Sequence, residues 1–258
     1  MRAALLTIAA LVLSVPPRAA AADAFQWHGS IGPGRSIEIK GVNGDVRAEP
    51  SGSNEVEVVA EKRAMRDDPE SVRIDVVPHD GDVTVCAVYP TRDASRPNEC
   101  VPGEGGRMNV QNNDVTVRFT VKVPAGVRLI GRTVNGDLEA KHLNGPVVLS
   151  TVNGSVDFST SASGRAKTVN GTIHGEMGRA DWDDTLDFST VNGSISLTLP
   201  SDLNADVKAQ TVNGDISTDF PLTVSGRISR RRLEGTIGGG GRTLSLETVN
   251  GGITLKRS

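Results

Sequence analysis

The chain has 258 residues and a formal net charge of −3, and 37% of its residues are hydrophobic but only 3% aromatic. This near-neutral balance, with few side chains that could stack on bases, argues against a nucleic-acid-binding protein. The 29 Gly and 13 Pro residues allow many turns but are too few for a collagen-like or wholly disordered chain. Because aromatic residues are scarce, Val, Leu and Ile must form most of the core.

Residues 1–22 are predicted to be a secretory signal peptide. Arg2 supplies a positive start, Ala3 to Val15 is apolar, and Ala19 to Ala22 offer small residues for cleavage. The apolar run is short for a membrane span, so a retained anchor is the less favoured alternative. We therefore expect a periplasmic or secreted protein with no membrane span after signal cleavage.

Residues 23–130 are predicted to form an irregular β region. Turn residues separate five stretches of alternating apolar and polar residues, which indicate strands. These stretches are 36–40, 55–62, 72–77, 82–89 and 114–123. We interpret the region as the start of a larger β structure that caps an open sheet edge. A separate domain is the alternative, although no Pro- or Ser-rich linker marks a boundary.

Cys86 and Cys100 are the only two cysteines of the chain. A predicted exported protein reaches an oxidising compartment, where such a pair forms a structural disulfide. Closing a loop of this length contributes roughly 3 kcal/mol in the chain-entropy model. A redox or metal pair is the alternative, but the spacing is neither C-x-x-C nor part of a four-ligand set.

An internal repeat dominates residues 131–258. Thr-Val-Asn-Gly occurs six times, and its asparagines are Asn135, Asn153, Asn170, Asn192, Asn213 and Asn250. Variants occur at 41–44, which contains Asn43, and at 142–145 and 232–235. The asparagines of the six copies are 18, 17, 22, 21 and 37 residues apart, and a degenerate copy at Glu234 would divide the last step. A period of about 20 residues is typical of stacked repeat structures.

The repeat predicts an all-β fold of the β-solenoid, or single-stranded β-helix-like, type with about 20 residues per coil. Residues around each copy alternate in polarity, as in the run from Leu186 to Leu199. If each coil stacks on its predecessor, the repeated Val forms a buried apolar column and the repeated Asn forms an amide ladder. Gly permits a bend where a Cβ would clash. Ordinary hairpins at each Asn-Gly are the alternative.

The alternation does not settle which side chain of each copy faces the core. Leu186 and Phe188 share one phase, whereas Val191 and Ile195 share the other. A break in phase must therefore fall near Ser189 or at the Asn-Gly turn. Whether Asn or Val points inward stays open at this level.

These T-V-N-G-[DST]-[ILV] segments, following a signal peptide, resemble the bacterial adhesin-like family called Toastrack, domain of unknown function 4097. The resemblance covers roughly residues 36–257 and is clearest from Thr133 onward. It implies a single-stranded β-helix-like stack and an association with the bacterial envelope. It implies no catalytic residues.

No metal or cofactor site is predicted. The four histidines are scattered without metal-ligand spacing. Asp45, Asp137 and Asp215 follow Asn-Gly in three copies and are interpreted as solvated turn acids, because the spacing typical of calcium-binding solenoids is missing.

Candidate contact residues are few. Trp182 lies among acidic residues in the 22-residue step, where it could stack on a sugar ring or simply fold over a coil edge. Arg230, Arg231 and Arg232 form a basic cluster that could meet an anionic surface, or merely decorate a solvated loop.

The leading functional hypothesis is a non-enzymatic, adhesin-like envelope protein that presents a rigid surface for binding. Its expected partner is an unknown envelope protein or polysaccharide, and neither nucleic acid nor a cofactor is expected. A carbohydrate-active solenoid enzyme is one alternative, because stacked coils could bring acidic residues together. An envelope-stress sensory module that acts with a membrane partner is the other.

Overall fold

The computed structural model describes residues 24–93, 95–179, 182, 185–224 and 229–258, and over these residues the protein is all-β. It contains 21 strands and, within these ranges, one short 3₁₀ turn, η1 (Pro69–Ser71). No helix of the described part is long and apolar enough to cross a membrane. The predicted signal peptide, residues 1–22, lies outside the described residues.

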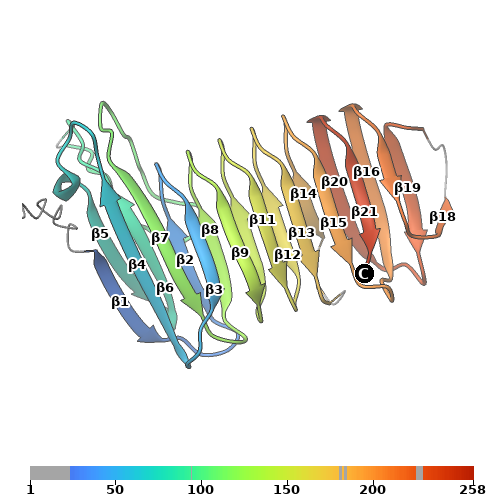
Figure 1. Ribbon diagram of the computed structural model, residues 1–258, viewed down its shortest axis with the longest axis horizontal. Helices are drawn as coiled ribbons and strands as arrows, with labels where there is room; N and C mark the ends of the chain where they lie inside the picture. The colour runs from blue at the N-terminus through green and yellow to red at the C-terminus, as the bar shows by residue number, and fades with distance from the viewer. Residues whose placement is uncertain (1–23, 94, 180–181, 183–184, 225–228) are drawn as a thin grey trace, which may run out of the picture.

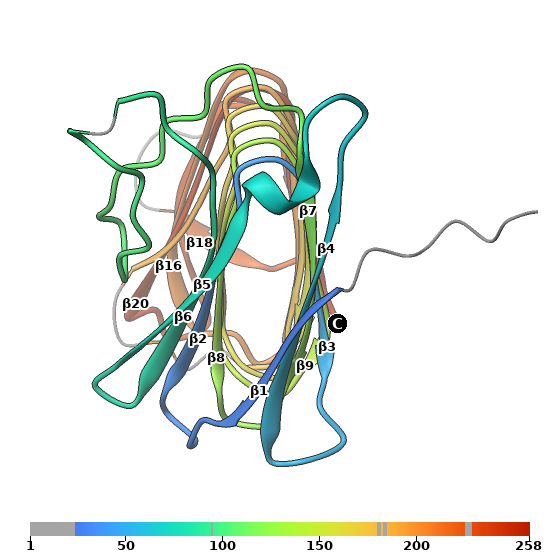
Figure 2. The ribbon, with the colours of Figure 1, turned by 90° about the vertical axis from the view of Figure 1, so that its left-hand side faces the viewer.

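The strands form two open sheets that face each other along the molecule (Figure 1, Figure 2). The first sheet has the spatial order β1 (Phe25–Ser30), β4 (Glu55–Arg63), β7 (Thr116–Val123), β3 (Val46–Pro50), β9 (Leu138–Leu143), β11 (Val156–Thr160), β13 (Ile173–Met177), β15 (Ile195–Leu199), β21 (Ile253–Arg257) and β17 (Ile216–Thr218). The second has the order β18 (Leu222–Val224), β19 (Arg232–Ile237), β16 (Ala205–Asn213), β20 (Arg242–Asn250), β14 (Leu186–Ser189), β12 (Gly164–Lys167), β10 (Val147–Ser150), β8 (Arg128–Arg132), β2 (Ser36–Lys40), β6 (Asp82–Val88) and β5 (Arg73–His79).

In the middle of the molecule each coil contributes one strand to each sheet. The chain runs along β10 in the second sheet, turns at 151–154, continues along β11 in the first sheet and then returns to β12. Equivalent residues of neighbouring coils pair in parallel, so that Val147 lies opposite both Leu129 and Gly164. This arrangement is the β-solenoid that the repeat predicted.

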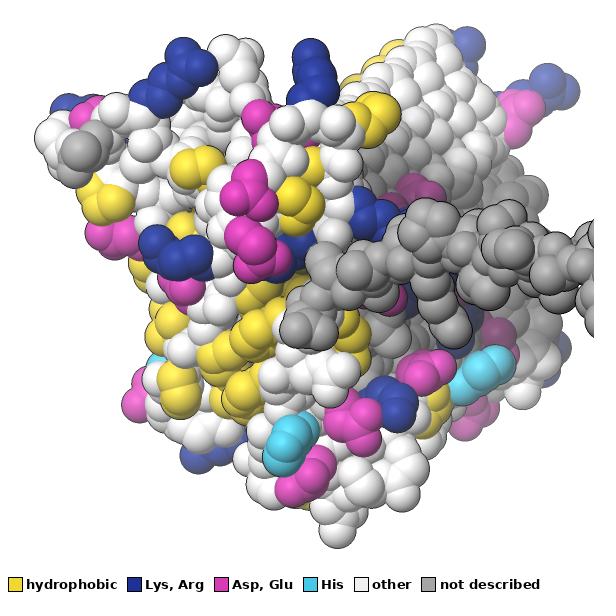
Figure 3. Space-filling view, turned by 60° about the vertical axis from the view of Figure 1, so that its left-hand side comes forward, with side chains coloured by type: hydrophobic (Ala, Val, Ile, Leu, Met, Phe, Trp, Pro, Cys, Tyr) yellow, Lys and Arg dark blue, Asp and Glu magenta, His cyan; other side chains and the backbone are white. Residues whose placement is uncertain are grey.

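Antiparallel pairing occurs only toward the two ends of the described sheets. At the N-terminal end, β1 pairs with β4, β4 with β7, and β5 with β6. At the other end, β19 pairs with β16 and β18. Phe25, Trp27, Ile74 and Val76 of the outermost strands β1 and β5 are half-buried against the core. Figure 3 shows apolar side chains gathered on this N-terminal end.

The coils do not all stack in sequence order, contrary to the expectation that each lies on its predecessor. The last coil, β20 and β21, lies between the coil of β14 and β15 and the coil of β16 and β17. At the N-terminal end, β2 and β3 lie between β6 and β7 on one side and β8 and β9 on the other. The strands nearest the chain ends are therefore paired on both sides, apart from β1 at the edge.

Two of the three predicted variant copies do not belong to the repeat ladder. Residues 142–145 lie at the turn from β9 to β10, on the edge of the solenoid opposite the T-V-N-G turns. Residues 232–235 lie within β19, antiparallel to β16, so Glu234 is not a degenerate copy. Only the variant at 41–44 joins the ladder, because Asn43 pairs with Asn135.

The core consists of inward-facing columns of aliphatic side chains, because inward and outward residues alternate along each strand. One column of the first sheet contains Leu138, Val156, Ile173, Ile195 and Ile253. The rings of Phe158 and Phe188 stack with centroids 6.2 Å apart. A Cβ on Gly164 or Gly175 would lie 2.3 or 2.4 Å from the Phe158 ring, so these glycines make room for it.

Each T-V-N-G turn hydrogen-bonds to its neighbour through two side chains. The Thr hydroxyls are buried and donate to the Gly carbonyl of the adjacent turn, as from Thr190 to Gly171 at 2.9 Å. The Asn side chains form a continuous amide ladder, with Nδ2 to Oδ1 distances from 2.7 to 2.9 Å. In spatial order the ladder is Asn43, Asn135, Asn153, Asn170, Asn192, Asn250 and Asn213. The predicted amide ladder is therefore present.

The Gly of each turn is required by close backbone approach. A Cβ on Gly171 would lie 1.9 Å from the carbonyl oxygen of Gly154 in the neighbouring turn, and Gly136, Gly154 and Gly193 are in the same situation. Side-chain hydrogen bonds can form between the turns only if the backbones come this close.

We predict that Gly171→Ala destabilises the protein strongly, because the added methyl group must push two turns apart. The expected loss is about 3 kcal/mol of unfolding free energy, at the upper end of overpacking costs. Urea denaturation followed by circular dichroism measures it. Gly32→Ala is the control, since nothing lies within 4 Å of a Cβ there, and it should change stability by less than about 0.5 kcal/mol. Equal, small effects of both changes would contradict the close-approach argument.

Candidate functional site

The valines of the T-V-N-G turns form an exposed row along one edge of the solenoid. This is the upper edge in Figure 1, where the strands of the second sheet turn into those of the first. The prediction that the repeated Val forms a buried column is wrong, because Thr occupies the inward position. Thr keeps the inward phase of the preceding strand, and its hydroxyl is satisfied by the neighbouring turn. Val then points outward. In spatial order and with exposed fractions from 36 to 48%, the valine row is Val134, Val152, Val169, Val191, Val249 and Val212.

The valine row is held rigidly in register. Each neighbouring pair of turns is joined by a parallel bridge, as between Asn153 and Asn170. Backbone bonds also join them, as from Asn170 N–H to Val152 O at 2.8 Å. Successive valines are therefore separated by the spacing of paired strands, about 4.8 Å. Since Val249 comes between Val191 and Val212, the row is assembled from segments that are distant in sequence.

Two of the three acids that follow Asn-Gly, Asp45 and Asp137, accept hydrogen bonds from backbone N–H groups. Asp45 Oδ1 accepts from the N–H of Asp137 at 3.1 Å, and Asp137 Oδ1 accepts from the N–H of Ser155 at 2.8 Å. Ser155 Oγ continues the series by accepting from Thr172 N–H at 3.3 Å. Their role is therefore to bridge neighbouring turns at the edge. Among the described residues, no group of three or more His, Cys, Asp or Glu side chains could hold a metal ion.

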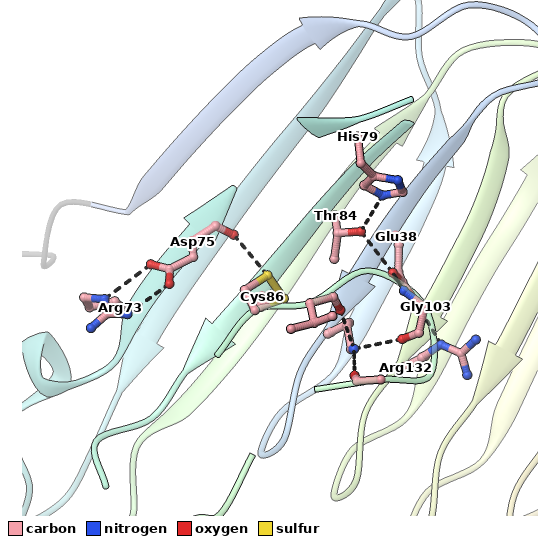
Figure 4. Close-up of a disulfide and its surroundings, with 12 residues drawn as sticks. Glu38, Arg73, Asp75, His79, Thr84, Cys86, Gly103 and Arg132 are labelled. Carbon is pink, nitrogen blue, oxygen red and sulfur yellow. Dashed lines mark hydrogen bonds and ion pairs between the residues drawn. A yellow bond between two sulfur atoms is a disulfide. The ribbon is translucent and has the colours of Figure 1, made fainter. Parts of the chain in front are cut away.

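A disulfide loop covers the N-terminal end of the valine row. Cys86 in β6 is bonded to Cys100, with their Cα atoms 5.6 Å apart, as the spacing predicted. The whole connection between β6 and β7, residues 89–93 and 95–115, is called the disulfide loop, and it takes the place of a tight T-V-N-G turn. Figure 4 shows the disulfide together with the charged side chains of Glu38 in β2, Arg132 in β8, and Arg73 and Asp75 in β5.

Lys40 fastens this loop to the solenoid. Its Nζ atom donates to the carbonyl oxygens of Val101, Gly103 and Gly105, each at 2.8 Å. Burial lowers the pKa of Lys40, although the nearby carboxylate of Glu38 raises it and Arg132 lowers it further.

Glu38 is the centre of the same polar network. Its side chain is 4% exposed, and it accepts from Arg132 Nε at 3.0 Å and from Gly103 N–H at 2.8 Å. The hydroxyl of Thr84 also donates to it at 3.0 Å and lies 3.0 Å from His79 Nε2. Because three donors from β6, β8 and the loop converge on this carboxylate, Glu38 helps to position the loop.

A hollow of about 280 Å³ lies between the loop and the first turns of the valine row. Its lining includes Lys40, Val42, Glu104, Met108, Arg132 and Val134. Val42 and Val134 belong to this lining, so the apolar edge and the loop meet at the hollow. The arrangement offers apolar area and hydrogen-bonding groups to a ligand.

Trp182 is not an exposed contact residue, contrary to one sequence interpretation. The side chain is 3% exposed, and its indole Nε1 donates to Thr243 O at 3.2 Å. The acids on either side of it, at 181, 183 and 184, lie outside the described residues. A buried indole with a satisfied N–H packs against the solenoid and cannot stack on a sugar.

The basic cluster is exposed but differs among its members. Arg230 and Arg231 are exposed, and their carbonyl oxygens accept from Ile216 N–H and Thr211 N–H. Arg232 is paired with Glu234, with Nη2 2.7 Å from Oε1. The cluster lies beside the far end of the valine row and does not join the disulfide loop.

Sequence reasoning missed the valine row as a candidate site. Its signal was the Val in every T-V-N-G copy, but outward and inward positions cannot be told apart without the geometry of the turn.

The family model described as Toastrack DUF4097 matches residues 34–256 of the chain. No curated protein matches it. Among solved structures, the chain is similar to a "putative cell adhesion protein" from Clostridium sporogenes ATCC 15579 at 10% identity and a TM-score of 0.49, covering 91% of this chain and 100% of that one. It is also similar to a "putative adhesin" from Bacteroides fragilis NCTC 9343 at 13% identity and a TM-score of 0.25, covering 91% and 97%. This likeness is too low to indicate a ligand.

Tyr89, at the start of the disulfide loop, provides a pH test of the anchoring. It is the only tyrosine of the chain, its side chain is buried, and its hydroxyl donates to Val115 O at 2.8 Å. Burial raises the pKa of Tyr89 from 10.0 to about 12, although its bond to Asn43 lowers it.

We predict that unfolding free energy attributable to Tyr89 is present in full below pH 10 and is lost as the pH rises through about 12. The folded state holds the phenol proton more tightly than the unfolded state does, so deprotonation favours unfolding. The expected loss is about 2 kcal/mol relative to Tyr89→Phe, which lacks the titrating group. Absorbance at 295 nm should show a native midpoint near 12. A midpoint at 10 in the folded protein would contradict the burial.

Proposed function

The chain belongs to the Toastrack family, domain of unknown function 4097, and from this premise we propose that it is an adhesin-like binding protein of the bacterial envelope. The observation that carries the proposal is the valine row. Six half-exposed apolar side chains stand in line on an edge whose hydrogen-bonding groups are largely used within the fold. Contiguous exposed apolar surface of this kind marks interaction sites.

Rigidity would be the mechanism of binding. Backbone bridges and the amide ladder hold the row in place, so binding would cost little ordering entropy. Covering one half-exposed valine contributes on the order of 1 kcal/mol. Useful affinity therefore requires a partner that follows several turns, which favours an elongated envelope protein or polysaccharide.

A binding role is more compatible with this edge than a catalytic one. The side chains it presents to solvent are chiefly Val and Asn, which do not exchange protons near neutral pH. The nearest buried carboxylate, Glu38, accepts three hydrogen bonds within the fold. We therefore propose a non-enzymatic protein that acts without a cofactor.

Export to the periplasm or beyond the cell is part of the proposal. The Cys86–Cys100 disulfide supports it, because such bonds persist in oxidising compartments. The predicted signal peptide at residues 1–22 agrees with this location.

We predict that the triple change Val152→Thr, Val169→Thr and Val191→Thr lowers binding at least tenfold without unfolding the protein. Threonine keeps the β-branched shape but replaces an outward methyl group with a hydroxyl, which weakens apolar contact. Binding would be measured on a polysaccharide array and to solubilised envelope proteins, with the thermal midpoint as a check on folding.

The control makes the same substitution at two half-buried valines on the outer faces of the sheets, Val59 and Val148. This control should retain binding. Unchanged binding by the triple variant would remove the valine row from the site, and turnover of any glycan by the purified protein would overturn the non-enzymatic role.

A further inference from the structure

The first turn of the amide ladder, residues 41–44, has an uncovered side. Every later turn through Asn250 lies between two others, but toward the N-terminal end the next coil, β6 and β7, has the disulfide loop instead of a tight turn. Hydrogen-bonding groups that pair with the preceding turn elsewhere in the ladder therefore have no preceding turn to pair with at residues 41–44.

Interior turns show which groups these are. Val169 N–H and Asn170 N–H both donate to Val152 O, at 3.2 and 2.8 Å. Asn170 Nδ2 donates to Asn153 Oδ1 at 2.8 Å. The same pattern recurs at Val191 and Asn192, so each turn directs three donors toward the turn on its N-terminal side.

At the first turn the two backbone donors, Val42 N–H and Asn43 N–H, have no acceptor among the described residues, whereas the side-chain amide of Asn43 is hydrogen-bonded to Tyr89. The remaining groups of Asn43 are engaged, since its Oδ1 accepts from Asn135 at 2.9 Å and its carbonyl accepts from Val117 N–H at 2.7 Å. The turn therefore presents only donors on its free side. Successive backbone N–H groups of this kind form an anion-binding concavity.

A hollow of about 570 Å³ lies against Val42 and Asn43, within the range of small-ligand sites. Its apolar lining is Val42, Val134, Met108 and Val110. Asn109 and Asn112 add side-chain amides without a hydrogen-bond partner among the described residues.

Arg66 supplies positive charge to this hollow. Its guanidinium is 85% exposed, with Nε 3.4 Å from Asp114 Oδ2. The other oxygen of Asp114 accepts from Asp67 N–H at 3.0 Å. The only carboxylate of the lining is thus paired and hydrogen-bonded, and the Nη groups of Arg66 stay available.

We propose that this hollow binds the free carboxyl terminus of a peptide. One carboxylate oxygen would accept from Val42 N–H and Asn43 N–H, as the Val carbonyl does between interior turns, and the guanidinium of Arg66 would supply the opposite charge. Capture of a terminal carboxylate by successive backbone N–H groups is an established mode of peptide recognition. An apolar last side chain would pack on Val42, Val134 and Met108.

The lining favours a peptide over an acidic sugar. Its four apolar residues are aliphatic, and none of the residues that line the hollow is aromatic, as stacking on a sugar ring would require. The donors also stand where a peptide carbonyl is bound in every interior turn. The amide oxygens of Asn109 and Asn112 can accept the ligand's backbone N–H.

This site shares Val134 with the valine row but does not rest on the function proposed for that row. The hollow lies under the disulfide loop, whereas Val152, Val169 and Val191 are further along the edge. If the threonine variants bind their partner unchanged, the carboxylate site is not affected. If the peptide does not bind, the function proposed for the valine row is not affected.

The test is nuclear magnetic resonance titration of the full mature chain, labelled with ¹⁵N, using N-acetyl-Ala-Val as the probe. We expect the backbone signals of Val42 and Asn43 to shift. The same peptide with an amidated C-terminus should bind at least tenfold more weakly, because it lacks the charge and one acceptor. Equal shifts with both peptides, or no shift with either, would overturn the proposal.

Asn43→Asp is the matched variant, since its carboxylate can still accept from Asn135 but repels the ligand. It should weaken binding at least tenfold. Asn144→Asp is the control, because Asn144 Oδ1 likewise accepts one bond, from Ser161 Oγ at 3.3 Å, on the opposite edge. Loss of binding in both variants, or in neither, would contradict the assignment. Stronger binding of galacturonate than of the peptide would overturn the peptide class.

Discussion

The close approach of successive T-V-N-G turns is the constraint on which the rest of the structure depends. Gly without a Cβ lets neighbouring backbones meet, and this brings each Thr hydroxyl and each Asn amide within hydrogen-bond distance of the next turn. A single such bond contributes only about 1 kcal/mol. Repeated along seven turns, the bonds fix the register of both sheets, and the aliphatic columns of the core follow from that register.

The surface of the edge is a by-product of the same bonding. Since Thr fills the inward position and Asn the lateral one, Val is the side chain left to face solvent. At the first turn the series of bonds ends, and the donors that would meet another turn face a hollow instead. The valine row and the unpaired donors of the first turn thus both come from one repeated unit. The loop held by Lys40 and the disulfide shapes only the N-terminal end.

Several parts of the fold and the site could be predicted from residue patterns alone. Repetition of Asn and Gly at a fixed period indicated the ladder and the close approach, and the cysteine spacing indicated the disulfide. The direction of Val could not be predicted, because strand alternation does not continue through a turn whose backbone angles are unknown. The acidic neighbours of Trp182 likewise suggest an exposed residue, whereas the side chain is buried and its indole N–H donates to Thr243 O, which is distant in sequence.

The class of fold, the period of the coil and the residues that join one turn to the next could be read from residue patterns, because these depend on local chemistry repeated many times. The order of the coils could not, because it depends on packing between distant segments. Every T-V-N-G turn presents nearly the same surface, so the turn at Asn250 can stack on Asn192 as well as the turn at Asn213 could. Which one does so is decided by the packing of β16, β19 and β20, whose contacts span long separations along the chain.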